Sequence, residues 1–100
     1  MKRTNRKRKA AAFSKAFGDI DRVAFVRGLG CLICGDPAEA AHVRSRAAGG
    51  GPDDLVPLCR VHHRSQHSLG IRTFEFRHGL DLTAAAAWCA EVYHHHTGAA

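Results

Sequence analysis

Three cysteines and one histidine stand in two pairs with the spacing of a metal site. Two residues separate Cys31 from Cys34, and two also separate Cys59 from His62. Such a pair can hold one face of a tetrahedral ion from a single turn, and a second pair completes the shell. Gly35 suits the tight turn after the first pair. We predict a structural zinc site of the Cys3His type; the alternative is free core thiols beside a surface histidine.

A second group of histidines overlaps the first. His63 follows His62 directly, and His67 comes four residues after His63. On a helix, adjacent residues point about 100° apart, whereas residues four apart share a face. His63 and His67 can therefore face together while His62 turns to the zinc. Such a pair can hold a divalent ion with open positions; taken alone, it is more often two solvated histidines on a polar helix.

The elements that must position these residues form one small α+β unit. Apolar spacing predicts a helix within residues 13–27, with Asp19 as its N-cap. A short strand over residues 38–46 is centred on His42, a glycine-rich loop covers 47–54, and an apolar run over 55–58 suits a second strand. A polar helix follows over 59–67 and ends at Gly70, while 71–78 fits a helix or a strand.

The last segment reads as a helix that begins at Asp81 or Thr83. Its apolar face is predicted to carry Leu82, Ala86, Cys89 and Tyr93, with Ala85 and Val92 beside it. We expect Cys89 to be a buried small hydrophobe and not a ligand. The spare apolar surface of this helix suggests a homodimer.

The charge is uneven along the 100 residues. Fifteen Lys and Arg stand against nine Asp and Glu, and six of the basic residues lie within the first nine positions. The remainder is therefore net neutral. We predict a disordered basic arm over residues 1–12, followed by a single domain over 13–97. The arm is either a solubilising tail or a phosphate-binding segment that gains affinity by releasing counterions from nucleic acid.

Membrane insertion and export are not expected. The chain has no apolar run of about 18 residues, and its basic N-terminus lacks the apolar region of a secretory signal. We expect a cytoplasmic protein whose four cysteines are metal ligands or thiols and not disulfides.

The motifs between residues 31 and 75 form a recognisable arrangement. The segments are CLICG at 31–35, AHVRSRAAGGGPDDLVPLCRVHHRSQH at 41–67 and GIRTFE at 70–75. In this order the chain resembles the HNH endonucleases, also called ββα-metal or His-Me finger nucleases, and within them the small zinc-bearing, phage-type branch. The resemblance implies an α+β fold with a ββα-metal core, a structural zinc knuckle and flanking helices.

The resemblance also implies an activity and residue roles. The activity is metal-dependent hydrolysis of DNA phosphodiester bonds, on DNA expected to be double-stranded. His42 matches the general base that acts on water, and Asp54 matches the middle residue, usually Asn, that orients the base across the ββ loop. His63 matches the ligand of a catalytic divalent ion (Mg²⁺, Mn²⁺, Zn²⁺ or similar), with His67 as a further ligand. The structural zinc set corresponds to Cys31, Cys34, Cys59 and His62.

Two positions depart from the family pattern. Ala41 stands where a metal-binding Asp, Glu or His is common, and Glu39 is a possible substitute. Asp54 replaces the usual Asn, and it accepts hydrogen bonds but lacks an amide donor. These departures favour an alternative, a catalytically weak or inactive zinc-stabilised DNA-binding module. A third reading is a structural zinc protein whose histidine-rich helix contacts another protein.

Arginines flank the histidines in the sequence. A planar guanidinium can bind phosphate through two parallel hydrogen bonds. Their alternative is ordinary surface charge. The candidate DNA-binding residues are Arg44, Arg46, Arg60 and Arg64.

Overall fold

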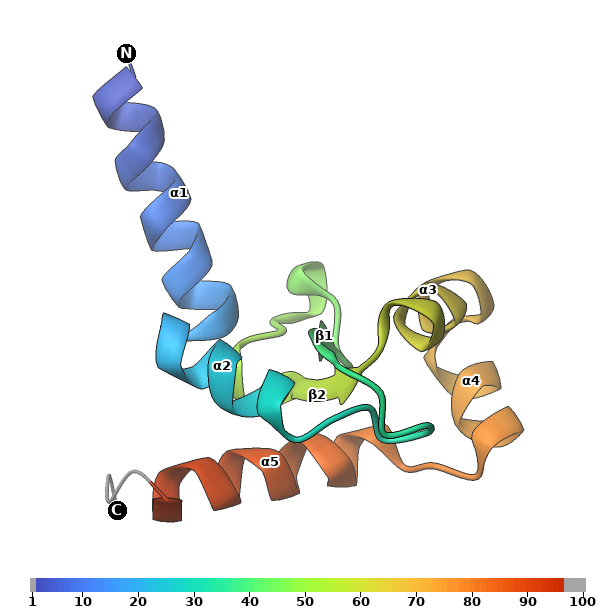
Figure 1. The fold of residues 1–100 in the computed structure, drawn as a ribbon. Coiled ribbons are helices and arrows are strands. Elements are labelled where there is room, and N and C mark those ends of the chain that lie inside the picture. The colour runs from blue at the N-terminus through green and yellow to red at the C-terminus, as the bar shows by residue number, and fades with distance from the viewer. Residues whose placement is uncertain (1, 97–100) are drawn as a thin grey trace.

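The computed structural model combines five α-helices with a two-stranded sheet; it describes residues 2–96, without the side chains of residues 2–6 and 46 (Figure 1). In chain order the elements are α1 (Lys2–Phe17), α2 (Ile20–Gly28), β1 (Glu39–His42), the 3-10 turns η1 (Arg46–Ala48) and η2 (Pro52–Asp54), β2 (Leu55–Leu58), α3 (Arg60–Leu69), α4 (Ile71–His78) and α5 (Leu82–His96). The expected α+β class and the presence of two strands are confirmed, but β1 covers only Glu39–His42 and ends at His42, whereas the sequence predicts it over residues 38–46 with His42 at its centre.

The sheet is an antiparallel pair that sets the position of His42. Glu39 lies opposite Leu58, and His42 lies opposite Leu55. Beyond the last pair, the Val43 N–H donates to the Asp54 carbonyl at 2.8 Å, which closes the loop between the strands. All four residues of β2 are buried, as the short apolar run indicates. The strand that carries His42 is therefore fixed against a buried partner.

The core lies between this sheet, α4, α5 and the turn that carries the first cysteine pair. Val56, Leu58, Phe74 and Leu82 are each at most 1% exposed in it. In Figure 1, α5 runs below the sheet and α2. Helices α3 and α4 lie together on the side of the sheet opposite α1 and α2. Residues 71–78, which fit a helix or a strand in sequence, form a helix that buries Phe74 in this core.

Short polar groups set the helix ends. Asp19 caps α2, as predicted, by accepting the Arg22 N–H at 2.8 Å. Cys59 occupies the N-cap position of α3, and Gly70, with φ 82°, ends that helix.

The loop over residues 47–54 is ordered by two 3-10 turns. Its Gly50 is required there because a Cβ at this position would collide with the Arg44 carbonyl.

Helix α1 differs from the predicted disordered arm. Residues 2–12 continue the helix that ends at Phe17, and residues 7–15 are exposed. Figure 1 shows α1 projecting away from the rest of the molecule. Lys, Arg and Ala are strong helix formers, so helix propensity competes with the repulsion between like charges. The predicted arm begins at Met1 and the predicted domain ends at residue 97. Both residues lie outside the part of the chain that the structure describes.

Helix α5 follows the predicted pattern. Asp81 accepts the Ala84 N–H at 3.0 Å, and Leu82, Ala86 and Cys89 are buried. Cys89 is 1% exposed, as expected of a small core residue. Tyr93 is half-buried, and the Arg22 guanidinium lies over the face of its ring. Among the helices of residues 2–96, none has the length and apolarity needed to cross a bilayer.

Candidate functional site

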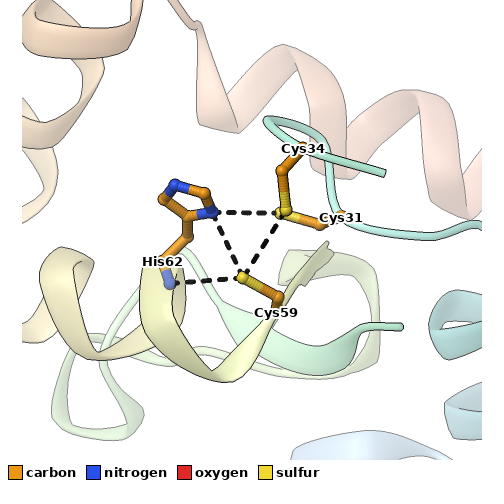
Figure 2. Close-up of side chains that lie close together, drawn as sticks. All are labelled: Cys31, Cys34, Cys59 and His62. Atoms are coloured by element: carbon orange, nitrogen blue, oxygen red, sulfur yellow. Dashed lines mark hydrogen bonds between the residues drawn. The ribbon is translucent and has the colours of Figure 1, made fainter. Parts of the chain in front are cut away.

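The two cysteine-containing pairs meet at the start of α3. Cys31 and Cys34 lie on the turn before β1, while Cys59 caps α3 and His62 lies in its first turn (Figure 2). Their ligand atoms all lie within 4.8 Å of one another. Cys31 and Cys59 are buried, whereas Cys34 is exposed. The predicted four-residue cluster is therefore assembled, and these residues are positioned to bind a metal ion.

Backbone hydrogen bonds shape the cysteine turn. Cys31 N–H donates to the Asp36 carbonyl and Gly35 N–H to the Cys31 carbonyl, both at 2.9 Å. Gly35 has φ 77°, the left-handed conformation that favours glycine. Leu32 N–H donates to the Pro57 carbonyl at 3.0 Å, which ties the turn to β2. The chain thus brings the first pair to the second through the strand that precedes α3.

The distances within the cluster fit a tetrahedral ion. The Cys34 and Cys59 sulfurs are 3.8 Å apart, and His62 Nδ1 lies 3.5 Å from the Cys31 Sγ and 3.2 Å from the Cys59 Sγ. With metal–sulfur bonds of about 2.3 Å, tetrahedral zinc requires sulfurs about 3.7 Å apart and a nitrogen about 3.5 Å from each sulfur. The spacing and the soft thiolate donors match a structural zinc.

The pKa values of the two cysteines on this turn shift in opposite directions. Burial raises the pKa of Cys31, but backbone hydrogen bonds at Cys59, Cys34 and Ile33 and the His62 side chain outweigh it and lower the pKa to about 6. At Cys34, the backbone hydrogen bond at Asp36 lowers the pKa, but desolvation, hydrogen bonds with Cys31 and Cys59 and the Cys31 charge together raise it to about 11. The negative charge of the Cys31 thiolate thus disfavours ionisation of Cys34. A divalent cation bound to both sulfurs would offset this repulsion.

Three of the four histidines singled out for chemistry line one cavity. This cavity, of about 560 Å³, is bordered by His42, His63 and His67, with Phe17 and Gln66 among its other residues. His42 comes from the end of β1, and the other two come from α3. Gln66, buried in α3, donates from its side-chain Nε2 to the His42 carbonyl at 3.0 Å. We call this cavity the histidine cleft.

His63 and His67 face each other across one helical turn. Their Nε2 atoms are 3.3 Å apart and their ring centroids 4.9 Å apart. His63 Nδ1 lies 2.9 Å from Glu39 Oε1. The hydrogen bond with His63 lowers the pKa of Glu39, and the charge of Arg60 lowers it further. The adjacent histidines 62 and 63 thus take separate sets of partners, as the helical spacing predicts.

The end of α1 holds the His42 ring. His42 Nε2 lies 2.7 Å from the Ala16 carbonyl, and the Phe17 ring packs on the imidazole with centroids 4.8 Å apart. A carbonyl only accepts, so Nε2 carries the proton and the neutral ring has its lone pair on Nδ1. No sequence motif indicates this contact, because the group from residue 16 is a backbone carbonyl.

Asp54 contacts the loop and not the His42 ring. Its Oδ2 accepts the Gly51 N–H at 2.9 Å, and its own carbonyl accepts the Val43 N–H. It therefore joins the two ends of the ββ loop beside His42. Ala41 is fully buried in the core and supplies no ligand. Glu39, a possible substitute ligand from sequence, instead contacts Nδ1 of His63.

The arginines are spread around the cleft. Arg60 and Arg64 border a second cavity, of about 350 Å³, together with Glu39, His63 and His67. Arg60 Nε lies 3.6 Å from Glu39 Oε2, and its side chain is 77% exposed. Arg44 is exposed on the loop after β1. Arg46 begins η1, and its side chain lies outside the described part of the chain.

Comparisons with known proteins identify no relative. No protein-family model, no curated protein and no solved structure matches this chain.

Proposed function

We propose that this protein is a metal-dependent DNA endonuclease of the HNH type, built on a ββα-metal core. The observation that carries the proposal is that His42, His63 and His67 border one cleft. They come from β1 and α3, the two elements that a strand–strand–helix core would place around a scissile phosphate. In this proposal the Cys3His cluster is structural, and the cleft performs the chemistry.

His42 is the proposed general base. The Ala16 carbonyl fixes its tautomer, so Nδ1 is the atom that takes a proton from water. A neutral imidazole with a free ring nitrogen can act as a general base. The Phe17 ring and the hydrogen bond from Gln66 restrict the orientation of this residue. Asp54 has an indirect role, because it holds the loop that begins beside His42.

His63 and His67 are the proposed ligands of the catalytic ion. Their Nε2 atoms are 3.3 Å apart, which is about the distance between two nitrogens bound to one tetrahedral ion with bonds near 2.05 Å. A divalent ion held there would polarise a phosphate oxygen and stabilise the departing 3′ oxygen. Positions not taken by the two imidazoles remain for water and phosphate.

The basic residues supply the proposed affinity for double-stranded DNA. Arg60 and Arg64 border the cavity beside the histidine cleft, and Arg44 is exposed on the loop that follows His42. Helix α1 adds exposed Lys7, Arg8 and Lys9. Contacts of this kind bind phosphates and carry no base readout, so we expect low sequence specificity and a steep dependence on salt.

Nicking of supercoiled plasmid by the zinc-loaded protein tests the proposal. We expect nicking with an added divalent ion and none after treatment with EDTA. His42→Ala is expected to lower the rate by at least about 100-fold, the usual contribution of a general base. His95→Ala, at an exposed position near the end of α5, is the matched control and should nick at the parent rate. Zinc content and circular dichroism confirm that both variants are folded; a His42→Ala protein that nicks as fast as the parent would refute the assigned base.

A second candidate, the zinc-stabilised DNA-binding module, is favoured by the burial of Ala41. This position supplies no ligand, so the ion would have only two protein nitrogens. The module would bind DNA with an affinity that falls steeply with salt, and it would not cleave plasmid with any divalent ion. A structural zinc protein that contacts another protein would show no such salt dependence.

The proposed homodimer involves α5. Trp88 on this helix is 55% exposed, which leaves an aromatic surface for a second copy. Such a dimer would allow two clefts to act on two DNA strands. Size-exclusion chromatography with light scattering distinguishes the dimer from a monomer of 10.8 kDa.

A further inference from the structure

Glu39 contacts the proposed catalytic ligand His63 on the side away from His67. Its Oε1 lies 2.9 Å from Nδ1 of His63, while Nε2 of His63 lies 3.3 Å from Nε2 of His67. An ionised carboxylate only accepts, so Nδ1 carries the proton. In a neutral ring the lone pair is then on Nε2, the nitrogen that faces His67.

This arrangement is the one by which proteins commonly orient a histidine on a metal. A carboxylate that accepts the second ring N–H fixes the tautomer, orients the ring and raises the basicity of the ligating nitrogen. Glu39 is suited to this by its position, because one carboxylate oxygen lies 2.9 Å from His63 Nδ1 and the other lies 3.6 Å from Arg60 Nε. The contact joins β1 to α3, and it therefore also fixes the ring relative to the strand that carries His42.

The donor set has a consequence for the choice of ion. The two facing atoms are both imidazole nitrogens, the carboxylate of Glu39 is engaged by His63 and Arg60, and Ala41 is buried. Mg²⁺ requires oxygen ligands in a near-octahedral shell and is bound weakly by imidazole. Zn²⁺, Co²⁺ and Ni²⁺ bind imidazole well, and the spacing of the nitrogens suits bonds of about 2.05 Å.

We infer that Glu39 is a positioning residue that presents His63 Nε2 to the ion, and that the His63–His67 pair selects a transition metal over Mg²⁺. The inference rests on the proposed function only in that it takes the second ion to bind at this pair. It specifies the class of ion, which the sequence motif alone leaves open. It also assigns a role to an acidic residue that is not itself a ligand.

Calorimetric titration of protein that already holds one zinc per chain tests the inference. We expect one further equivalent of Ni²⁺ or Zn²⁺ to bind, and Mg²⁺ to bind at least about 100-fold more weakly. Glu39→Ala should lower the Ni²⁺ affinity by about 10- to 100-fold, the usual effect of losing such a partner. Glu39→Gln keeps an acceptor oxygen without the charge, so it should recover part of the loss.

Two controls separate positioning from general folding effects. Glu91→Gln, at an exposed position of α5, should bind Ni²⁺ like the parent, and His67→Ala should abolish the second equivalent. Nitrogen-15 NMR of the His63 ring reports the tautomer directly. We expect the proton on Nδ1 in the parent and a mixture of tautomers in Glu39→Ala, a change that a purely structural ion pair would not require.

The outcomes distinguish this inference from the nuclease proposal. Unchanged Ni²⁺ affinity and tautomer in Glu39→Ala, or Mg²⁺ binding as tight as Ni²⁺ binding, would overturn the inference. Selective binding of Ni²⁺ without plasmid nicking would overturn the nuclease proposal and leave this inference standing. Nicking supported by Mg²⁺ alone, with weak Ni²⁺ binding, would support the nuclease proposal and overturn this inference.

Discussion

The Cys3His cluster and the histidine cleft take adjacent residues of α3, His62 and His63, and yet differ in composition, closure and burial. His62 lies among three sulfurs, two of them on buried cysteines, at distances that fit a closed tetrahedron. His63 lies in a cavity of about 560 Å³ with His42 and His67, where the donors are nitrogen. A closed set of four ligands has no position for substrate, whereas two imidazoles in a cleft leave several.

The comparison shows how one helical turn can serve two purposes. A rotation of about 100° per residue separates two neighbouring histidines into different environments. The Cys59 cap and the turn that begins at Cys31 determine the first environment; Glu39 and the end of α1 determine the second. Fold stabilisation and the proposed chemistry are therefore close in sequence but carried by separate side chains.

The largest expected effect is the loss of the cluster. Cys59→Ala removes a zinc ligand and the N-cap of α3, so we expect zinc content to fall from one per chain and the Tm to fall by more than about 10 °C. Atomic absorption and thermal denaturation measure the two effects. Cys89→Ala is the matched control, because this buried cysteine lies outside the cluster. It should keep the zinc; loss of zinc from Cys89→Ala instead would contradict the assigned ligand set.

The adjacent histidines give the sharpest contrast. His62→Ala should weaken zinc binding and lower the free energy of unfolding by several kcal/mol, because one of four ligands is lost. His63→Ala should keep the zinc, lower the free energy of unfolding by about 1 kcal/mol or less, and lose the second metal equivalent. Urea denaturation together with metal analysis measures both. Equal loss of stability in the two variants would contradict the assignment of fold stabilisation to the cluster alone.

The loop between the strands contributes Ser45 to the cleft and no residue to the cluster. Gly50→Ala places a Cβ against the Arg44 carbonyl, so we expect it to destabilise the fold by about 1–3 kcal/mol. Gly51→Ala is the matched control: its nearest atom, the Lys15 carbonyl, is at an ordinary 3.5 Å. Chemical denaturation should separate the two variants, with zinc content unchanged in both. An equal cost for the two would show that the loop adjusts freely.

The smallest expected effect is at Asp54. Asp54→Asn keeps a side-chain oxygen that can accept the Gly51 N–H, so we expect a change of less than about 0.5 kcal/mol in the free energy of unfolding. Plasmid nicking should also stay within about 2-fold of the parent, since Asp54 acts on His42 through the loop backbone. A large loss of nicking with unchanged stability would assign Asp54 a direct contact with the base or the substrate.

Local patterns predicted much of this architecture. The Asp19 cap, the strand at residues 55–58 and the helix after Cys59 follow from signals a few residues long, and all three are present. The pairing of the two cysteine motifs was also predictable, because ligand spacing constrains a metal cluster strongly. Residues 71–78 were undecided in sequence, since burial of Phe74 is a tertiary property.

The residues that can ligate a metal, and the faces of α3 that they occupy, are predictable from sequence because ligand chemistry and helical periodicity are local. The contact of the Ala16 carbonyl with His42 and that of Glu39 with His63 are visible only in the folded chain. These contacts join groups 26 and 24 residues apart, and one of them uses a backbone atom. Such contacts depend on how α1, β1 and α3 pack together, which residue type and spacing do not encode.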